Sequence, residues 1–219
     1  MTVLAVAVFL EKKYLLYVKP LATISLILLY LDHAKTKNVF VIISLLVIIA
    51  TDTFTYMDFE GYFERITSLI TVFYSFCVLA LRGYLSEEEV NPAKLISVPV
   101  IISAILISYL IYTITEMVFP KIEDSIVFVV MIVISLVTFF LICFFIYVAD
   151  RFEKSIFLFV AGCCTMFVDA LLAVNELYYY TTVFTVLINF AEILGLYFFI
   201  RFFIQAKPKD MQSLTKEYF

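Results

Sequence analysis

Long apolar segments dominate the chain and recur at nearly regular intervals. After a first apolar stretch at residues 1–10, seven such segments follow, at 14–31, 38–57, 62–84, 94–119, 125–149, 154–176 and 181–205. Each of the seven reaches the length of about 20 residues that an α-helix needs to cross a bilayer. A backbone in lipid must satisfy its hydrogen bonds internally, and no segment shows the alternation typical of a strand. The pattern predicts an all-α, polytopic transmembrane helix bundle of seven to eight helices.

The first ten residues, MTVLAVAVFL, leave the number of helices open. They are too short to span a bilayer, and they lack the basic start and small-residue cleavage site of a signal peptide. We expect either a short helix or a chain start that is truncated relative to its relatives. Residues 1–205 are then expected to be a single transmembrane helical domain, followed by a polar cytoplasmic tail at 206–219.

The composition agrees with a membrane protein: 64% of the 219 residues are hydrophobic and 16% are charged, whereas globular domains average about 45–50% and 25%. The net charge of −4 is spread along the loops, with no basic stripe for nucleic acid. Cys77, Cys143, Cys163 and Cys164 lie in apolar segments, and His33 is the only histidine. We therefore expect neither a His/Cys metal centre nor a cofactor.

The basic residues predict an orientation, because Lys and Arg are enriched in cytoplasmic loops. We assume a cytoplasmic N-terminus and count the first short segment as a crossing. Ten of the 15 basic residues then lie on the cytoplasmic side, namely Lys35, Lys37, Arg82, Lys94, Arg151, Lys154, Arg201, Lys207, Lys209 and Lys216. The expectation is a multi-pass protein of the cell (inner) membrane with a cytoplasmic C-terminus. The sequence leaves the oligomeric state undetermined.

Several polar side chains interrupt the apolar segments, where an ionisable group costs about 2.5–3.5 kcal/mol at the bilayer centre. These residues are Lys19, Asp52, Asp169, Asn175, Asn189 and Glu192. They come from four separate segments, and in the assumed topology all of them fall in the same outer half of the bilayer. Inverting the topology would move all of them together. We therefore predict that they line one shared cavity.

Each of these residues also has a simpler interpretation. Lys19 could extend from a helix start toward the headgroups, and Asp52 could cap a helix end. The two asparagines could join helices by hydrogen bonds, and Glu192 could pair with Lys19 or share a proton with Asp169. Two neighbouring carboxyl groups in a site of low dielectric do not both ionise readily, so one of them can act as a general acid. The same condition suits a proton-coupled transporter.

Four stretches resemble the motifs of one family. Lys19–Pro20 enters a helix like that family's KP motif, and Asp52 closes the next helix like its GD motif. The stretch GCCTMFVDALLAVNEL is similar to its G-x-x-x-F-x-x-S-D-x-x-L-A-x-N segment, and NFAEILGLYF stands where its final Tyr-x-Ala-Gln helix is expected. Over nearly its whole length the chain resembles the YhhN family of membrane proteins, whose characterised animal members are lysoplasmalogenases.

The resemblance implies hydrolysis of the vinyl-ether bond of a lysophospholipid, which releases a fatty aldehyde and a glycerophospho-alcohol. In such a reaction an acid protonates the alkenyl carbon, carboxylates stabilise the resulting oxocarbenium ion, and water adds. The catalytic candidates are Asp52, Asp169 and Glu192, with Asp169 or Asp52 as the acid. The substrate-binding candidates are Lys19, which would receive the phosphate, together with Asn175 and Asn189. A lipid substrate and the membrane are the expected partners.

The chain also departs from the family pattern. Thr51 replaces the Gly of GD, Val168 replaces the Ser of SD, and Glu192 replaces the final Gln. The helix ITSLITVFYSFCVLALRGY lacks the histidine that the family often carries there. The alternative function is a non-catalytic lipid-binding protein or a proton-coupled transporter of small molecules or lipids, which would use the same cavity. Transport would be favoured by inverted repeats and broken helices, and the sequence shows neither clearly.

Overall fold

The computed structural model describes residues 2–9, 12–85 and 126–208, together with the single positions 105, 108, 112 and 116. The described chain forms seven α-helices without a β-strand: α1 (Thr2–Phe9), α2 (Leu15–His33), α3 (Val39–Met57), α4 (Phe63–Leu81), α7 (Ile126–Ala149), α8 (Ile156–Leu177) and α9 (Thr182–Gln205). Short 3-10 turns precede α2 at Lys12–Tyr14 and follow α4 at Arg82–Tyr84. The expected all-α class is confirmed.

Six of these helices are long and apolar enough to cross a membrane: α2, α3, α4 with its following turn, α7, α8 and α9. They correspond to six of the seven predicted segments, which confirms a multi-pass membrane protein. The predicted segment 94–119 and most of the predicted tail lie outside the described residues. The first apolar stretch forms the eight-residue helix α1, about 12 Å long at 1.5 Å per residue.

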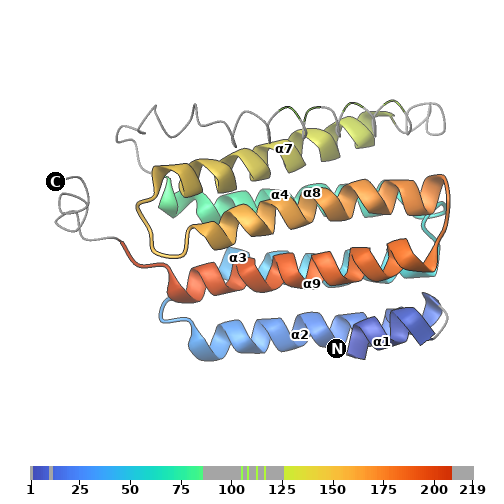
Figure 1. Cartoon of the computed structure of the whole chain (residues 1–219), viewed down its shortest axis with the longest axis horizontal. Coiled ribbons are helices and arrows are strands. Elements are labelled where there is room, and N and C mark those ends of the chain that lie inside the picture. The colour runs from blue at the N-terminus through green and yellow to red at the C-terminus, as the bar shows by residue number, and fades with distance from the viewer. Residues whose placement is uncertain are drawn as a thin grey trace.

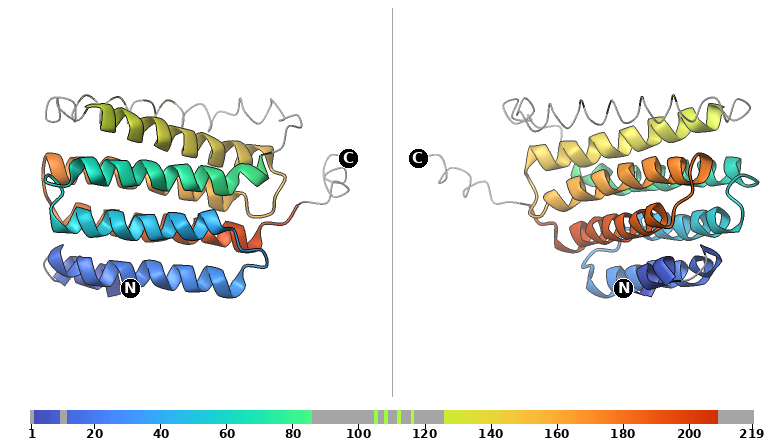
Figure 2. Two further views of the ribbon diagram at one scale, coloured as in Figure 1. Left: turned by 180° about the vertical axis from the view of Figure 1, so that it is seen from behind. Right: turned by 45° about the vertical axis from the view of Figure 1, so that its right-hand side comes forward.

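The helices run side by side along the long axis of the molecule (Figure 1). Both further views show the same order of levels, with α2 at one edge, then α3 and α9, then α4 and α8, and α7 at the other edge (Figure 2). Helices α8 and α9 pack against each other along their lengths. A Cβ atom added to Gly195 of α9 would lie 2.9 Å from the Cβ of Cys164 of α8, so the missing side chain permits this approach.

Helix α1 does not cross the bundle and instead packs against α9 and α2. Its residues Val3, Val6 and Ala7 are buried and cluster with Leu15, the first residue of α2. Partly buried side chains of α3 and α9 pack against this small core. The short apolar start therefore covers the end of the bundle at which α2 begins.

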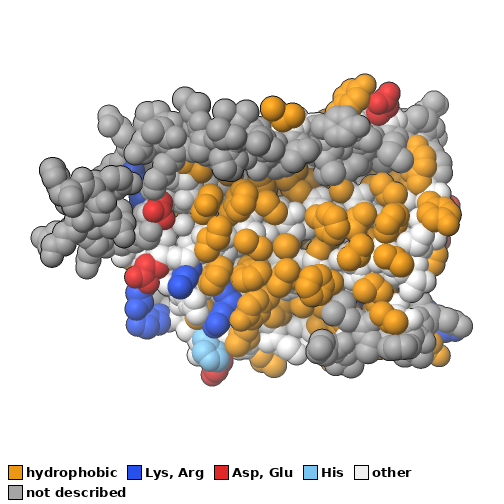
Figure 3. All heavy atoms as spheres, in the orientation of Figure 1, with side chains coloured by type: hydrophobic (Ala, Val, Ile, Leu, Met, Phe, Trp, Pro, Cys, Tyr) orange, Lys and Arg blue, Asp and Glu red, His pale blue; other side chains and the backbone are white. Residues whose placement is uncertain are grey.

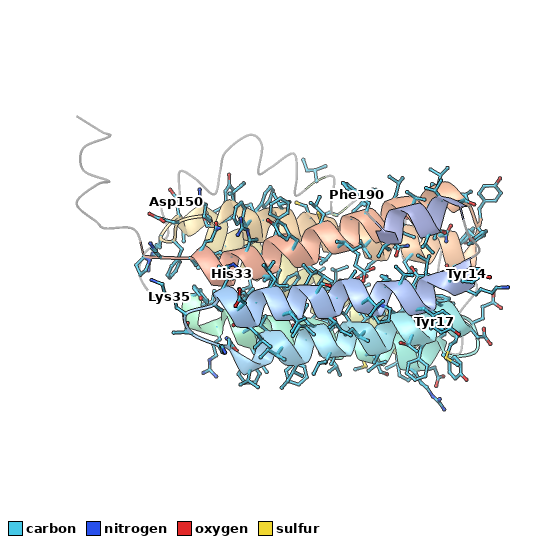
Figure 4. The ribbon with its side chains drawn as sticks, turned by 90° about the horizontal axis from the view of Figure 1, so that it is seen from below. Tyr14, Tyr17, His33, Lys35, Asp150 and Phe190 are labelled. Carbon is cyan, nitrogen blue, oxygen red and sulfur yellow. The ribbon has the colours of Figure 1, made fainter. Side chains whose placement is uncertain are left out.

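The two ends of the bundle differ in surface chemistry. Charged side chains gather where α2 and α9 end, while hydrophobic side chains cover the middle of the same face (Figure 3). Tyr14 and Tyr17 lie at one end of the molecule, and His33, Lys35 and Asp150 lie at the other (Figure 4). A hydrophobic surface that ends at a group of charged side chains suits a helix bundle placed in a bilayer.

Candidate functional site

Lys19 lies inside the bundle and joins three helices. Its ammonium nitrogen is 2.6 Å from Oδ1 of Asp52 in α3 and 2.5 Å from Oε2 of Glu192 in α9. The exposed fraction of the side chain is 4% for Lys19, 6% for Asp52 and 10% for Glu192. Because the ammonium group is buried and paired, it does not extend toward the headgroups. Lys19, Asp52 and Glu192 are called the lysine cluster below.

Tyr56 closes one side of the lysine cluster. The Lys19 nitrogen lies 5.1 Å from the centre of the Tyr56 ring, within the range of a cation–π interaction. The Tyr56 hydroxyl donates to Oδ1 of Asn189 at 3.1 Å, and the Asn189 amide donates to the backbone carbonyl of Thr185 at 2.7 Å. Asn189 therefore acts on the cluster through Tyr56, as a hydrogen-bonding residue between α3 and α9.

The lysine cluster retains unused hydrogen-bonding capacity. Asp52 Oδ2 and Glu192 Oε1 are buried and have no partner in the part of the chain that the structure describes. Buried polar atoms in proteins nearly always accept or donate a hydrogen bond, to protein or to water. One ammonium group also balances only one of two carboxylates. Each of these two oxygens can accept a hydrogen bond from water or from a ligand.

Asp169 lies in a different environment. Its Oδ2 accepts a hydrogen bond of 2.6 Å from the hydroxyl of Tyr74 in α4. Tyr74 is 2% exposed, and its ring packs against Phe73 at 5.1 Å and Phe139 of α7 at 5.4 Å between ring centres. Among the described residues, no Lys or Arg forms an ion pair with Asp169. A neutral hydroxyl therefore supports this carboxyl group.

The lysine cluster and the Tyr74–Asp169 pair line one cavity of about 40 Å³. Its polar lining includes Lys19, Asp52, Tyr56, Tyr74, Asp169 and Glu192, and the rest of the wall is mainly apolar. A water molecule needs roughly 10–15 Å³ of such a cavity, so a few waters or a small chemical group would fit. The structure thus brings together four of the six residues that the sequence singled out.

These four residues occupy the same half of the bundle. Counted along their helices at 1.5 Å per residue, Lys19 and Asp52 lie about 6 Å and 7.5 Å from the helix ends nearest Tyr14. Asp169 and Glu192 lie about 12 Å and 15 Å from the ends of α8 and α9 on that side. The common depth explains how side chains of four helices converge on one cavity.

Asn175 lies outside this arrangement. Its Oδ1 accepts from the backbone N–H of Thr181 at 2.9 Å, and its amide donates to Glu176 at 3.2 Å and to Thr185 at 3.4 Å. It does not line the cavity. Its hydrogen bonds close the turn between α8 and α9, and the substrate-binding role predicted for Asn175 receives no support from this geometry.

Sequence reasoning did not single out Tyr74. The chain holds 15 tyrosines, and a neutral hydroxyl in an apolar helix attracts less notice than a charge does. One available signal was Asp169 itself, because a carboxyl group inside a membrane needs a hydrogen-bonding partner on another helix. The helix that lacks the expected histidine supplies that partner.

We also considered whether the described side chains could bind a metal ion. Among the described residues, no group of three or more His, Cys, Asp or Glu side chains is placed to hold a metal ion. The four cysteines are reduced, and Cys77 and Cys143 are buried among apolar side chains. The ionisable groups that line the cavity are carboxyl, ammonium and phenol groups.

Fold and cavity together define a multi-pass α-helical membrane protein with a buried site of carboxyl groups. Comparisons of the chain with protein-family models, with curated proteins and with solved structures found no match. The resemblance to the YhhN family accordingly rests on the four sequence stretches that contain Lys19, Asp52, Asp169 and Glu192.

Proposed function

We propose that the protein is a membrane-embedded lipid hydrolase resembling the lysoplasmalogenases, which cleaves the vinyl-ether bond of a lysophospholipid. The observation that carries this proposal is the cavity shared by Lys19, Asp52, Asp169 and Glu192. Ionisable residues inside membrane helices are uncommon and usually mark a functional site. All four lie in the stretches that resemble the YhhN family, with Glu192 in the place of that family's final Gln, and this resemblance supports the same chemistry here.

The reaction needs an acid, a counter-charge and a base. The acid transfers its proton to the alkenyl carbon that does not bear the ether oxygen, which leaves an oxocarbenium ion stabilised by nearby carboxylates. Water then adds to the carbon bound to the ether oxygen and gives one proton to a carboxylate. The resulting hemiacetal divides into a fatty aldehyde and a glycerophospho-alcohol, so one water molecule is consumed for each ether cleaved.

The contacts favour particular residues for these roles. Asp169 is the better acid, because burial without a neighbouring cation disfavours the ionised carboxylate. Asp52, bound to the ammonium group of Lys19, is the better counter-charge. Glu192 keeps Oε1 without a partner among the described residues, and this atom can accept a hydrogen bond from the attacking water.

Lys19 has a different role in this proposal from the phosphate binding that the sequence suggested. Its ammonium nitrogen is already bound by two carboxylates, and the cavity of about 40 Å³ suits a few waters or a small chemical group. We therefore assign Lys19 to holding Asp52 and Glu192 in place. The headgroup would remain at the surface of the bundle, and the vinyl-ether bond would reach the cavity.

We further propose that the C-terminus lies in the cytoplasm of a cell with an inner membrane. The end of the bundle where α9 finishes holds His33 and Lys35 (Figure 4), and several Lys and Arg side chains gather there (Figure 3). Cytoplasmic loops are enriched in Lys and Arg. The cavity would then lie in the outer half of the bilayer, closer to the outer headgroups.

The test compares three lysophospholipids that share one headgroup. Detergent-purified protein is incubated with the vinyl-ether, the saturated alkyl-ether and the acyl compound, from about pH 5 to about pH 8. We expect fatty aldehyde from the vinyl ether alone, since only that bond yields an oxocarbenium ion by protonation at carbon. Absence of aldehyde at every pH, alongside an active lysoplasmalogenase, would contradict the proposal.

The small volume of the cavity favours a second candidate, a proton-coupled transporter or lipid-binding protein. About 40 Å³ suits protons, waters or a small polar group better than a whole lipid. Protein that binds the radiolabelled vinyl-ether lipid without releasing aldehyde would support lipid binding. Ligand uptake into proteoliposomes that depends on a pH gradient would support transport.

A further inference from the structure

We infer that Tyr74 is the positioning residue for Asp169 and determines which of its two oxygens carries the transferable proton. This inference rests on the proposed function, because it specifies the acid of that reaction. The Tyr74 hydroxyl donates to Oδ2 of Asp169 at 2.6 Å. With one donor bound to Oδ2, that oxygen acts as the acceptor, and the proton of the neutral carboxyl group belongs on Oδ1.

The position of the Tyr74 hydroxyl is fixed by packing. The side chain is 2% exposed, and aromatic rings of α4 and α7 lie against its ring. Asp169 comes from α8, so the hydrogen bond connects two helices that are far apart in sequence. A donor held in this way fixes the plane of the carboxyl group as well as the choice of oxygen. General acid catalysis depends on such placement, since the proton must point at the reacting carbon.

The other titratable groups around the cavity act on Asp169 differently. Glu192 of α9 is a second carboxyl group at the cavity, while Lys19 of α2 is held between Glu192 and Asp52 of α3. The residue of α7 that packs beside Tyr74 is the uncharged Phe139. Tyr74 is therefore the described side chain that donates a hydrogen bond directly to Asp169.

Tyr74→Phe tests the inference, because it removes one oxygen atom and keeps the packed ring. We expect kcat to fall about 10- to 100-fold while KM stays within about twofold, as for a lost hydrogen bond to a charged group. The alkaline limb of the kcat–pH profile should move up by about one pH unit, because the carboxylate form loses its donor. Tyr84→Phe is the matched control, since its ring packs against Phe202 at 5.0 Å in an aromatic cluster outside the cavity.

A merely structural role would give another result. Tyr74→Phe would then lower the yield or the unfolding temperature and leave the pH profile of the surviving enzyme unchanged, and that outcome would overturn the inference. Replacing Tyr74 with a fluorinated tyrosine gives an independent variant, in which a more acidic phenol strengthens the hydrogen bond. The alkaline limb should then move to lower pH, and a limb that stays in place also counts against the inference.

Infrared difference spectroscopy separates this inference from the proposed function. The carboxyl absorption of Asp169 is identified as the band lost in Asp169→Asn, and we expect Tyr74→Phe to shift it whether or not the protein hydrolyses any lipid. Tyr56→Phe removes a hydroxyl from the same cavity that is bonded to Asn189, so it should leave the band in place. If the wild type is inactive and Tyr74→Phe still shifts the band, the hydrolase proposal is refuted and the Tyr74–Asp169 pairing is retained. If the wild type is active and Tyr74→Phe leaves the band in place, the pairing alone is refuted.

Discussion

The lysine cluster and the Tyr74–Asp169 pair line the same cavity but hold their carboxyl groups by different means. In the cluster, one ammonium group contacts two carboxylates of other helices at 2.5–2.6 Å. In the pair, one neutral hydroxyl contacts one carboxyl group at 2.6 Å. Loss of the Lys19 charge leaves two buried carboxyl groups without a counter-charge, whereas Asp169 can gain or lose a proton without breaking an ion pair. The cluster is therefore suited to holding helices together, and the pair to moving a proton.

Removing the cation of the cluster should have the largest effect on stability. Lys19→Met leaves Asp52 and Glu192 buried without a counter-charge, and we expect a loss of about 3–5 kcal/mol in the free energy of unfolding. The measurement is thermal or denaturant unfolding in detergent. Combining Lys19→Met with Asp52→Asn and Glu192→Gln should recover much of this loss, because no unbalanced charge remains. A single variant as stable as the wild type would show that the three groups are not ionised together.

Substitution of Asp169 should lower activity strongly and stability little, in contrast to substitution of Lys19. Asp169→Asn removes the transferable proton, and we expect kcat for the vinyl-ether lipid to fall about 10²-fold or more. Stability should change by less than about 1 kcal/mol, since the amide oxygen can still accept a hydrogen bond from Tyr74. The two measurements are aldehyde release and unfolding of the same preparation. An Asp169→Asn variant that is stable and fully active would remove Asp169 from the reaction and leave Asp52 as the remaining candidate acid.

The shared depth of the polar residues explains how much of the site the sequence could predict. Helix ends were visible as changes in hydropathy, and counting residues from them placed Lys19, Asp52, Asp169 and Glu192 in one half of the bundle. The depth of a residue in the bilayer does not determine, however, toward which neighbouring helix its side chain points. Asn175 follows Asp169 by six residues, which rotates it by about 240° around the helix axis at 100° per residue. It therefore points to the α8–α9 turn instead of the cavity.

The pairing of individual side chains could not be predicted in the same way. Whether Lys19 contacts Asp52, Glu192 or Asp169 depends on the rotation of α2 relative to α3, α8 and α9, which packing contacts determine. The close approach of α8 and α9 at Gly195 and Cys164 is one such contact. The spacing of apolar residues does not predict which two residues meet there. Tyr74 illustrates the same limit, because its role appears only once α4 is placed beside α8.

Tyr56 gives the smallest of the expected effects and refines the comparison within the cluster. Tyr56→Phe removes the hydrogen bond to Asn189 and keeps the ring beside Lys19, so we expect a loss of about 0.5–1.5 kcal/mol in the free energy of unfolding. Tyr56→Leu also removes the ring and should cost about 1–2 kcal/mol more if the ring stabilises the buried ammonium group. Equal unfolding of the two variants would mean that the carboxylates alone stabilise Lys19, and that the cluster needs no aromatic neighbour to hold its charge in lipid.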